Sequence, residues 1–194
     1  VEGLYEMWDE LLAKHPGLAI DNCASGGRRI DIETCKRSVP LWRSDSGCWE
    51  APPQWNQVQS LGLSLFIPLH STGIQAADAY TFRSAAAAGA ICELGYMDSG
   101  FSTEQARAAI AEAKEDARFW YGDLYPLTNC NIATDHLLAF QLHRADLDAG
   151  IVLAFRREDC PAHAVLAPLS GVHKDRKYRL EFLDDARKST QTTV

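Results

Sequence analysis

The alternation of short apolar runs with helical segments over residues 4–121 constrains the fold more than any other feature of the sequence. A helical segment comes first, and four units follow in which an apolar run leads into a segment that suits a helix. The four apolar runs are Leu18–Ile20, Val39–Arg43, Leu63–Leu69 and Ala90–Leu94. This alternation predicts a parallel α/β layer, which is either an open sheet or part of a (β/α)8 barrel.

End signals mark the predicted helices. Leu4, Trp8 and Leu12 recur at helical spacing before a stop at residues 15–17. Further helices are expected over residues 31–37, 52–61 and 78–88. The last helix begins at the capping-box pattern Ser102-Thr103-Glu104-Gln105 and is expected to stop before Gly122. Its predicted apolar face comprises Ala106, Ala109, Ile110, Ala113, Ala117 and Trp120.

After Leu127 the helical segments give way to short β-rich runs. These runs are Leu137–Leu142, Gly150–Phe155, His163–Leu169 and Lys177–Leu183. Turn-like residues at 146–150 separate the first two. The pattern predicts a small antiparallel β domain over residues 129–194, and we expect it to be incomplete because residues 188–194 offer no evident closing strand.

The acidic balance of the chain bears on its partners. The net charge is -7 and no segment is a basic stripe. Because binding to phosphate backbones relies on clustered Lys and Arg, we expect no nucleic-acid partner. No apolar run approaches the roughly 20 residues that a membrane-spanning helix needs, so we expect no membrane partner either.

The six cysteines show no spacing typical of a metal site. The chain has no CxxC pair, and no group of Cys and His has zinc-ligand spacing. A chain of 194 residues buries enough core to fold without disulfides. We therefore expect reduced thiols, no metal and a cytoplasmic protein.

Small and polar residues follow the first apolar run directly. Cys23, Ala24, Ser25 and Gly26 begin a glycine-containing loop that is neither a dinucleotide-binding fingerprint nor a P-loop. Small side chains let backbone N–H groups approach a ligand closely, which suits hydrogen bonds to sugar hydroxyls. A tight strand-to-helix turn without a ligand explains the same residues.

An aspartate between two tryptophans follows the second apolar run. Trp42, Asp45 and Trp49 lie within eight residues of one another. An apolar neighbourhood suits a general acid, because desolvation favours the protonated form of a carboxyl group. Tryptophan faces also stack on sugar rings. An aspartate that caps a loop beside core tryptophans fits the pattern as well.

Long motifs in the chain resemble glycoside hydrolase family 36, the α-galactosidase type. The likeness rests on the run DNCASGGRRIDIETCKRSVPLWRSD at residues 21–45, on Gln59, and on GLSLFIPLHSTG at residues 62–73. The run AFQLHRADLDAGIVLAFRRE at residues 139–158 resembles the start of the β domain that follows the catalytic barrel in this family. The resemblance implies that residues 1–128 are strands five to eight of a (β/α)8 TIM barrel and that residues 129–194 begin a C-terminal antiparallel β domain.

The resemblance also implies a chemistry. Members of the family hydrolyse α-galactosides with retention, using one carboxylate as nucleophile and another as general acid/base. Asp45 matches the acid/base, while Cys23–Gly26 and Trp42 match the sugar subsite. The family nucleophile lies in a Lys-Trp-Asp type motif that this chain lacks. The resemblance therefore implies an inactive fragment that carries the acid/base, an α-galactoside oligosaccharide as substrate, and no cofactor.

Three alternatives remain open at this point. An α-N-acetylgalactosaminidase shares the same chemistry, and a carbohydrate-binding protein without turnover keeps the loop and the tryptophans. An open-sheet protein with an unrelated ligand predicts that Cys23 and Asp45 lie on opposite faces. Glu93 and Asp98, after the last predicted strand, either face the pocket or cap loops. By analogy with relatives, a full-length parent is expected to be a homo-oligomer.

Overall fold

Four short extended segments lie side by side in chain order and run parallel. The computed structural model describes residues 1–185 and 187–193. Its parallel neighbours pair Asp21 with Val39, Trp42 with Ser71, and β1 (Gly73–Ile74) with β2 (Ile91–Cys92). We call this set the parallel arc; it comprises residues 20–22, 39–43, 70–74 and 91–94. The order matches successive strands of an α/β layer, with polar residues at the carboxyl ends.

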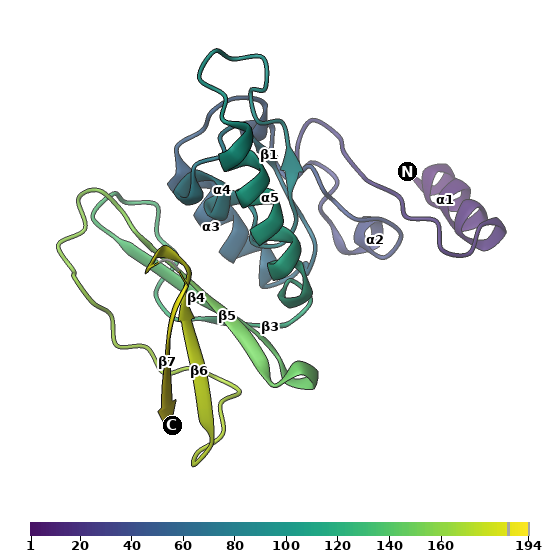
Figure 1. Cartoon of the computed structure of the whole chain (residues 1–194). Coiled ribbons are helices and arrows are strands. Elements are labelled where there is room, and N and C mark those ends of the chain that lie inside the picture. The colour runs from purple at the N-terminus through teal and green to yellow at the C-terminus, as the bar shows by residue number, and fades with distance from the viewer. Residues whose placement is uncertain (186, 194) are drawn as a thin grey trace.

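Helices connect the segments of the arc. They are α1 (Glu2–Lys14) before it, α2 (Ile32–Cys35), α3 (Pro53–Ser64) and α4 (Ala79–Ala85) within it, and α5 (Thr103–Asp116) after it. Asp31, Asp78 and Ser102 each accept a hydrogen bond from the backbone N–H three residues on, which explains where α2, α4 and α5 begin. Figure 1 shows α3, α4 and α5 grouped together, with α1 and α2 set apart from them.

The prediction of a strand over Leu63–Leu69 is wrong. Helix α3 continues to Ser64, the chain turns at residues 65–66, and the extended segment lies at 70–74 instead. A short apolar run does not distinguish a strand from the end of a helix, and Pro68 has no N–H to give to a sheet. The first two apolar runs form single parallel bridges rather than ladders.

The β region contains one sheet and one hairpin, both antiparallel. Strands β3 (Asp123–Pro126), β4 (Leu137–Arg144) and β5 (Ala149–Arg156) pair in that order. Strands β6 (Lys177–Phe182) and β7 (Lys188–Thr193) form the hairpin. Asp148 adopts a left-handed conformation with φ 46° and closes the connection between β4 and β5.

Two expectations for the β region are wrong. Residues 163–169 form no strand; they are irregular and largely exposed, and Pro161 before them and Pro168 among them have no N–H to give to a ladder. Residues 188–193, expected to leave the domain without a closing strand, pair with β6 along its length. Strand β3 also begins before the expected boundary near residue 128 and pairs with β4.

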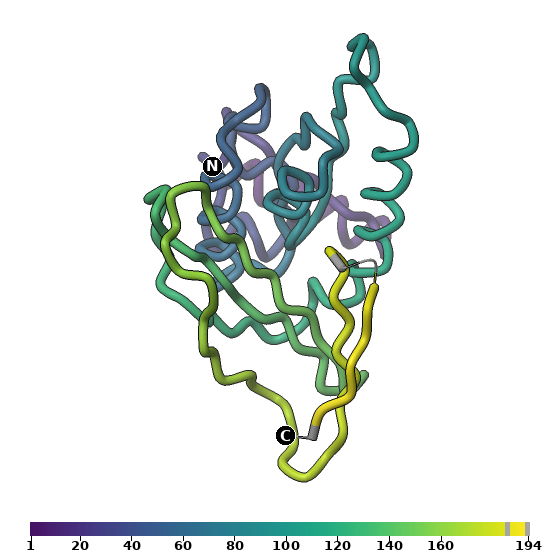
Figure 2. Tube along the Cα trace, turned by 60° about the vertical axis from the view of Figure 1, so that its left-hand side comes forward, coloured from purple at the N-terminus to yellow at the C-terminus, as the bar shows by residue number. Residues whose placement is uncertain are grey.

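Two apolar cores hold the molecule together. In the first, Ile74 of the arc packs with Phe82 of α4 and with the buried face of α5. In the second, Leu61 of α3 packs with Leu138 and Phe155 of the β sheet. Figure 2 shows the β region, green to yellow, lying against one side of the helical region, blue to teal. Because α3 also packs against α4, the helices join the arc to the β sheet.

Candidate active site

The loop after the first segment of the arc meets the turn after the second segment at Gly26 and Asp45. Gly26 has φ +52°, and a Cβ on it would lie 2.7 Å from Oδ1 of Asp45 and would overlap the Asp45 backbone nitrogen. Only glycine allows both the left-handed backbone and this close approach. The structure thus brings together the loop and the aspartate that the open-sheet alternative places on opposite faces.

The loop turns sharply and presents small side chains. Ser25, Gly26 and Gly27 have consecutive positive φ angles of 45°, 52° and 77°. Buried Asn22 fastens the loop by donating a 3.0 Å hydrogen bond from Nδ2 to the carbonyl of Arg29. Cys23 and Ser25 are exposed and Ala24 is half-buried. The thiol and the hydroxyl are therefore accessible to a ligand beside Asp45.

Asp45 begins a four-residue 3-10 turn, Asp45–Cys48, and is exposed. Trp42 donates a hydrogen bond from its indole Nε1 to Oδ1 of Asp45 at 3.2 Å. Within residues 1–185 and 187–193, Oδ2 has no hydrogen-bond partner and is open to a ligand. Trp49 is 51% exposed, so two tryptophans do not enclose the carboxylate as the sequence suggests. Trp42 acts on it through a hydrogen bond instead.

Arg43, next to Trp42 in the chain, anchors the site to α3. Its buried guanidinium donates to Gln59 Oε1 at 3.2 Å and to Ser60 Oγ at 3.1 Å. It also lies 3.0 Å from Nδ1 of buried His70. Desolvation lowers the pKa of Arg43 to about 9. Because side chains alternate along an extended segment, Trp42 reaches the site while Arg43 is fixed behind it.

His70 is neutral in this arrangement. Desolvation, with a smaller effect from the Arg43 charge, lowers its pKa to about 3. Since Arg43 has only donors, Nδ1 of His70 accepts, and Nε2 carries the proton and donates to Ser64 Oγ at 3.0 Å. His70 therefore supports the scaffold and does not reach the surface where Asp45 lies.

The opposite wall of the site comes from Gly73 of β1 and from Gln75 and Glu93, which directly follow β1 and β2. Gln75 donates from Nε2 to the carbonyl of Gly47 at 2.7 Å and to Oε2 of Glu93 at 2.5 Å. A Cβ on Gly73 would lie 2.9 Å from Glu93 Oε2 and 2.9 Å from Cη2 of Trp42. Glu93 thus belongs to the same site as Trp42, a question that its place in the sequence leaves open.

Sequence reasoning missed Gln75 and left Asp98 undecided. Gln75 lies directly after β1. The signal that could have identified it is a polar residue at the carboxyl end of an arc segment, but that segment lies beyond the strand predicted at Leu63–Leu69. Asp98 closes its own loop: its N–H donates to the carbonyl of Gly95 at 2.8 Å, and its carboxyl group lies against Gly95. Asp98 is therefore a loop residue.

The cysteines are unpaired and two of them flank the site. All six cysteines lie within the described ranges and none forms a disulfide. Desolvation and the negative charges of Asp45 and Glu93 raise the pKa of the exposed Cys48 thiol. In residues 1–185 and 187–193, no three His, Cys, Asp or Glu side chains are grouped so as to hold a metal ion. The polar groups near Asp45, such as the Trp42 indole N–H and the Gln75 amide, form hydrogen bonds.

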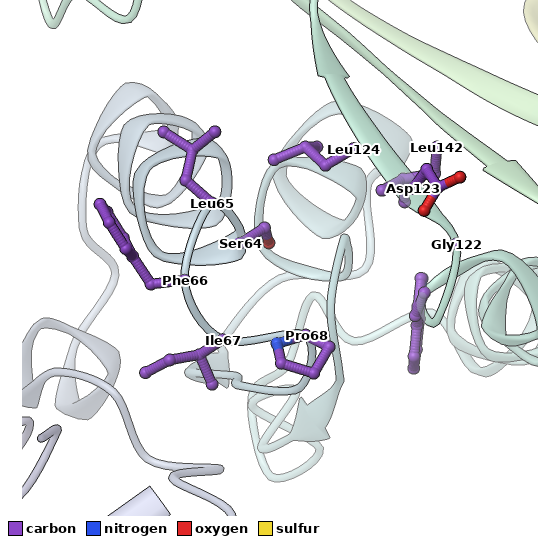
Figure 3. Close-up of a pocket in the computed structure, with 10 residues that line it drawn as sticks. Ser64, Leu65, Phe66, Ile67, Pro68, Gly122, Asp123, Leu124 and Leu142 are labelled. Carbon is purple, nitrogen blue, oxygen red and sulfur yellow. The ribbon is translucent and has the colours of Figure 1, made fainter. Parts of the chain in front are cut away.

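A separate cavity lies away from Asp45. It has a volume of about 280 Å³ and is lined by residues 64–68, by Trp120 and by residues from β3 and β4. Figure 3 shows Leu65 and Ile67 on one side of it and Leu124 on the other. Residues 65–68 precede the third segment of the arc, so this cavity is at the opposite ends of the segments from Asp45. A second and much smaller hollow, of about 10 Å³, is lined in part by Trp49, Gly73 and Gln75 beside the candidate site.

None of the helices in the described part of the chain has the length and apolar character needed to cross a membrane.

Comparisons with known proteins agree with this geometry at the level of the fold. No protein-family model matches the chain, and no curated protein matches it. Its fold is similar to a solved structure, the galactosidase domain of the alpha-galactosidase-sucrose kinase AgaSK, with a TM-score of 0.74 and 21% sequence identity. The match covers 97% of this chain and 27% of that chain, so this chain spans about a quarter of its length. The chain thus has the mixed α/β fold of part of a galactosidase domain, in agreement with the resemblance in its motifs.

Proposed function

We propose that this chain forms the acid/base half of a retaining α-galactosidase active site, with the parallel arc as strands five to eight of a (β/α)8 barrel. The contact between Gly26 and Asp45 carries the proposal, because it places a small-residue loop and a free carboxylate oxygen around one position. Barrel enzymes build their sites at this end of the strands, from the loops that follow them. The fold of the AgaSK galactosidase domain supports the same assignment.

In this proposal Asp45 serves as general acid and then as general base. The nucleophile attacks the anomeric carbon and forms a glycosyl-enzyme, while the Asp45 carboxyl group gives its proton to the departing glycosidic oxygen. The resulting carboxylate then removes a proton from the water that attacks the same carbon. The Trp42 N–H holds Oδ1, so Oδ2 is the oxygen that exchanges the proton. Cys23–Gly26 and the Trp42 ring contact the sugar.

The nucleophile is proposed to come from strands that this chain does not contain. No Lys-Trp-Asp motif occurs in the sequence. Within the described residues, the arc has an unpaired edge at residues 20–22 and another at Ile91–Cys92, where further barrel strands would pair. Glu93 is engaged by Gln75 and is not the nucleophile in this proposal. Without the carboxylate of the Lys-Trp-Asp motif the covalent step is missing, so the isolated chain is expected to be inactive.

Hydrolysis of 4-nitrophenyl α-galactoside tests the proposal. The purified chain alone is expected to give no turnover. Adding a polypeptide that supplies the Lys-Trp-Asp strand is expected to give turnover that Asp45→Ala strongly reduces, because the variant cannot activate the water that hydrolyses the glycosyl-enzyme. Turnover by the chain alone that depends on Asp45 would overturn the division of the site. Galactose binding without turnover in the combined protein would favour a carbohydrate-binding protein. If the combined protein preferred 4-nitrophenyl α-N-acetylgalactosaminide, the proposed substrate would be an α-N-acetylgalactosaminide instead of an α-galactoside.

A further inference from the structure

The turn that carries Asp45 has little to hold it from within. It spans four residues, and Ser44 caps it by accepting a 3.2 Å hydrogen bond from Ser46 N–H. Gly47 N–H donates to the Ser44 carbonyl at 3.1 Å. Such a short 3-10 segment is weakly stabilised by its own hydrogen bonds. A general acid must nevertheless be held within a fraction of an ångström, which calls for support from outside the turn.

Gln75, directly after β1, supplies that support. Its neighbours at Nε2, the Gly47 carbonyl and the Glu93 carboxylate, are both acceptors, so only the nitrogen of the amide satisfies both. Each of the two amide N–H groups therefore has its own acceptor. The bond to Glu93 is charge-assisted and is the stronger of the two kinds of contact. Glu93 thereby fixes the orientation in which Gln75 holds Gly47.

Gly73 shows that the approach of these groups is built into the fold. A side chain there would overlap the Gly47 carbonyl and crowd both Glu93 Oε2 and the Trp42 ring. Glu93 itself is placed by the backbone, because its N–H donates to the Ile74 carbonyl at 3.1 Å. Three successive segments of the arc thus converge on the turn that bears Asp45.

We infer that Gln75 and Glu93 are positioning residues, which hold the Asp45–Cys48 turn in place from the two neighbouring strands. The inference deepens the proposed function, on which the role of Asp45 rests. Neither residue takes part in proton transfer; Gln75 acts through the Gly47 carbonyl, and Glu93 acts through Gln75. We call the two hydrogen bonds from Gln75, to Gly47 and to Glu93, the tether. The tether explains why an exposed carboxylate on a four-residue turn has a defined place beside Trp42.

Four variants separate the two hydrogen bonds of the tether. Gln75→Glu is nearly isosteric and puts an acceptor against both Gly47 and Glu93. Glu93→Ala removes the partner of Gln75, whereas Glu93→Gln keeps an acceptor oxygen for it. The double variant Gln75→Glu/Glu93→Gln restores a hydrogen bond between positions 75 and 93 with the donor reversed, but it leaves the Gly47 carbonyl facing an acceptor.

Two readouts report on the turn in the full 194-residue chain without any sugar. Hydrogen exchange of the Ser46 and Gly47 amides measures how often the turn opens. The NMR resonance of the Trp42 indole N–H reports its hydrogen bond to Asp45. Gln75→Glu and Glu93→Ala are expected to speed exchange about tenfold and to shift the Trp42 resonance, since each removes a hydrogen bond worth about that factor. Glu93→Gln should stay within about threefold of the parent.

The double variant is decisive. If Gln75 acts through Gly47, the double variant recovers the thermal midpoint of the parent but keeps the fast exchange and the shifted Trp42 resonance. Recovery of all three properties would overturn the inference, because the pair would then only join β1 to β2. Unchanged exchange in Gln75→Glu would overturn it too. Gln105→Glu and Glu104→Gln, at exposed positions of α5, are the matched controls and should change neither readout.

A titration with D-galactose keeps the two proposals apart. If the exchange results hold but galactose does not shift the resonances of the Asp45 turn, the tether stands and the proposed function fails. If galactose binds and Gln75→Glu leaves exchange unchanged, the tether fails and the proposed function stands.

Discussion

The indole N–H of Trp42 donates a 3.2 Å hydrogen bond to Oδ1 of Asp45, three residues further along the chain. Trp42 belongs to an extended segment of the arc, and Asp45 begins the turn after it. The bond links Asp45, the proposed general acid, to the extended segment that pairs with Ser71. It also divides the carboxylate into one held oxygen and one free oxygen.

Trp42→Phe is expected to weaken acid catalysis while leaving the fold intact. The substitution keeps an aromatic ring but removes the donor to Asp45. With the nucleophile strand supplied, kcat/KM for an alkyl α-galactoside should fall about tenfold or more, which corresponds to one lost hydrogen bond. The loss should be smaller for 4-nitrophenyl α-galactoside, whose leaving group needs less proton transfer. Trp55→Phe, on the surface of α3, is the control; equal losses for both substrates would contradict the assignment.

Gly26→Ala is expected to destabilise the chain by about 1–3 kcal/mol, because a side chain there combines a strained left-handed backbone with overlap on Asp45. Chemical denaturation measures the change. Gly62 in α3 has no atom within 4 Å of an added Cβ, so Gly62→Ala should stabilise the chain by about 0.5–1 kcal/mol. If both substitutions stabilised the chain, Gly26 and Asp45 would not be in contact.

His70 is expected to make the chain less stable in acid. Its pKa falls from an ordinary value of 6.5 to about 3 in the folded chain. Between these values the unfolded chain binds a proton at His70 that the folded chain does not. The contribution of His70 to the unfolding free energy is therefore fully present above pH 6.5 and is lost as the pH drops below it. The slope from this one group is at most about 1.4 kcal/mol per pH unit.

Denaturation of His70→Gln between pH 4 and 7 measures that contribution. Glutamine can accept from Arg43 and donate to Ser64 without titrating. The variant should show a flatter dependence of unfolding free energy on pH than the parent. His163→Gln, in an exposed stretch, should keep the parent slope. A parent-like slope in His70→Gln would show that His70 is not the buried neutral group described here.

Arg157 is expected to stabilise the junction between the β region and helix α3. Its buried side chain donates to Gln57 Oε1 at 3.0 Å and to the carbonyls of Asn131 and Ala133 at 2.6 and 2.7 Å. Arg157→Ala leaves these acceptors without a donor and should cost about 2–4 kcal/mol of unfolding free energy. Arg179→Ala, in an exposed ion pair on β6, should change it by less than about 0.5 kcal/mol. Similar costs for both would contradict this account.

Local signals in the sequence predicted much of the fold. The Ser102 capping pattern places the start of α5, where Ser102 accepts from Gln105 N–H, and the helical spacing identifies Ala106 and Ala109 as buried. The prediction of a strand at Leu63–Leu69 is wrong because length and apolarity do not distinguish a strand from a helix end. The sequence did not predict strand β7, because its residues are polar and show no apolar pattern. Its pairing with β6 is a contact between two segments that a local pattern does not encode.

The sequence also predicted one part of the candidate site and missed another. The loop at Cys23–Gly26 and Asp45 follow apolar runs, and that position alone marks them as residues at the carboxyl ends of the arc. Gln75 was missed because the third segment lies beyond the predicted strand. The role of Glu93 depends on its contact with Gln75, which only the three-dimensional arrangement defines.

The most direct test of the central claim is an NMR titration of the isotope-labelled chain with D-galactose, compared with its epimer D-glucose. The account predicts that galactose shifts the amide resonances of Cys23–Gly26, the Trp42 indole resonance and the Asp45 amide together, with one dissociation constant, and that glucose does so more weakly. Shifts confined to residues outside this group, or shifts of the loop without shifts of Trp42 and Asp45, would contradict a single sugar subsite built by these two segments.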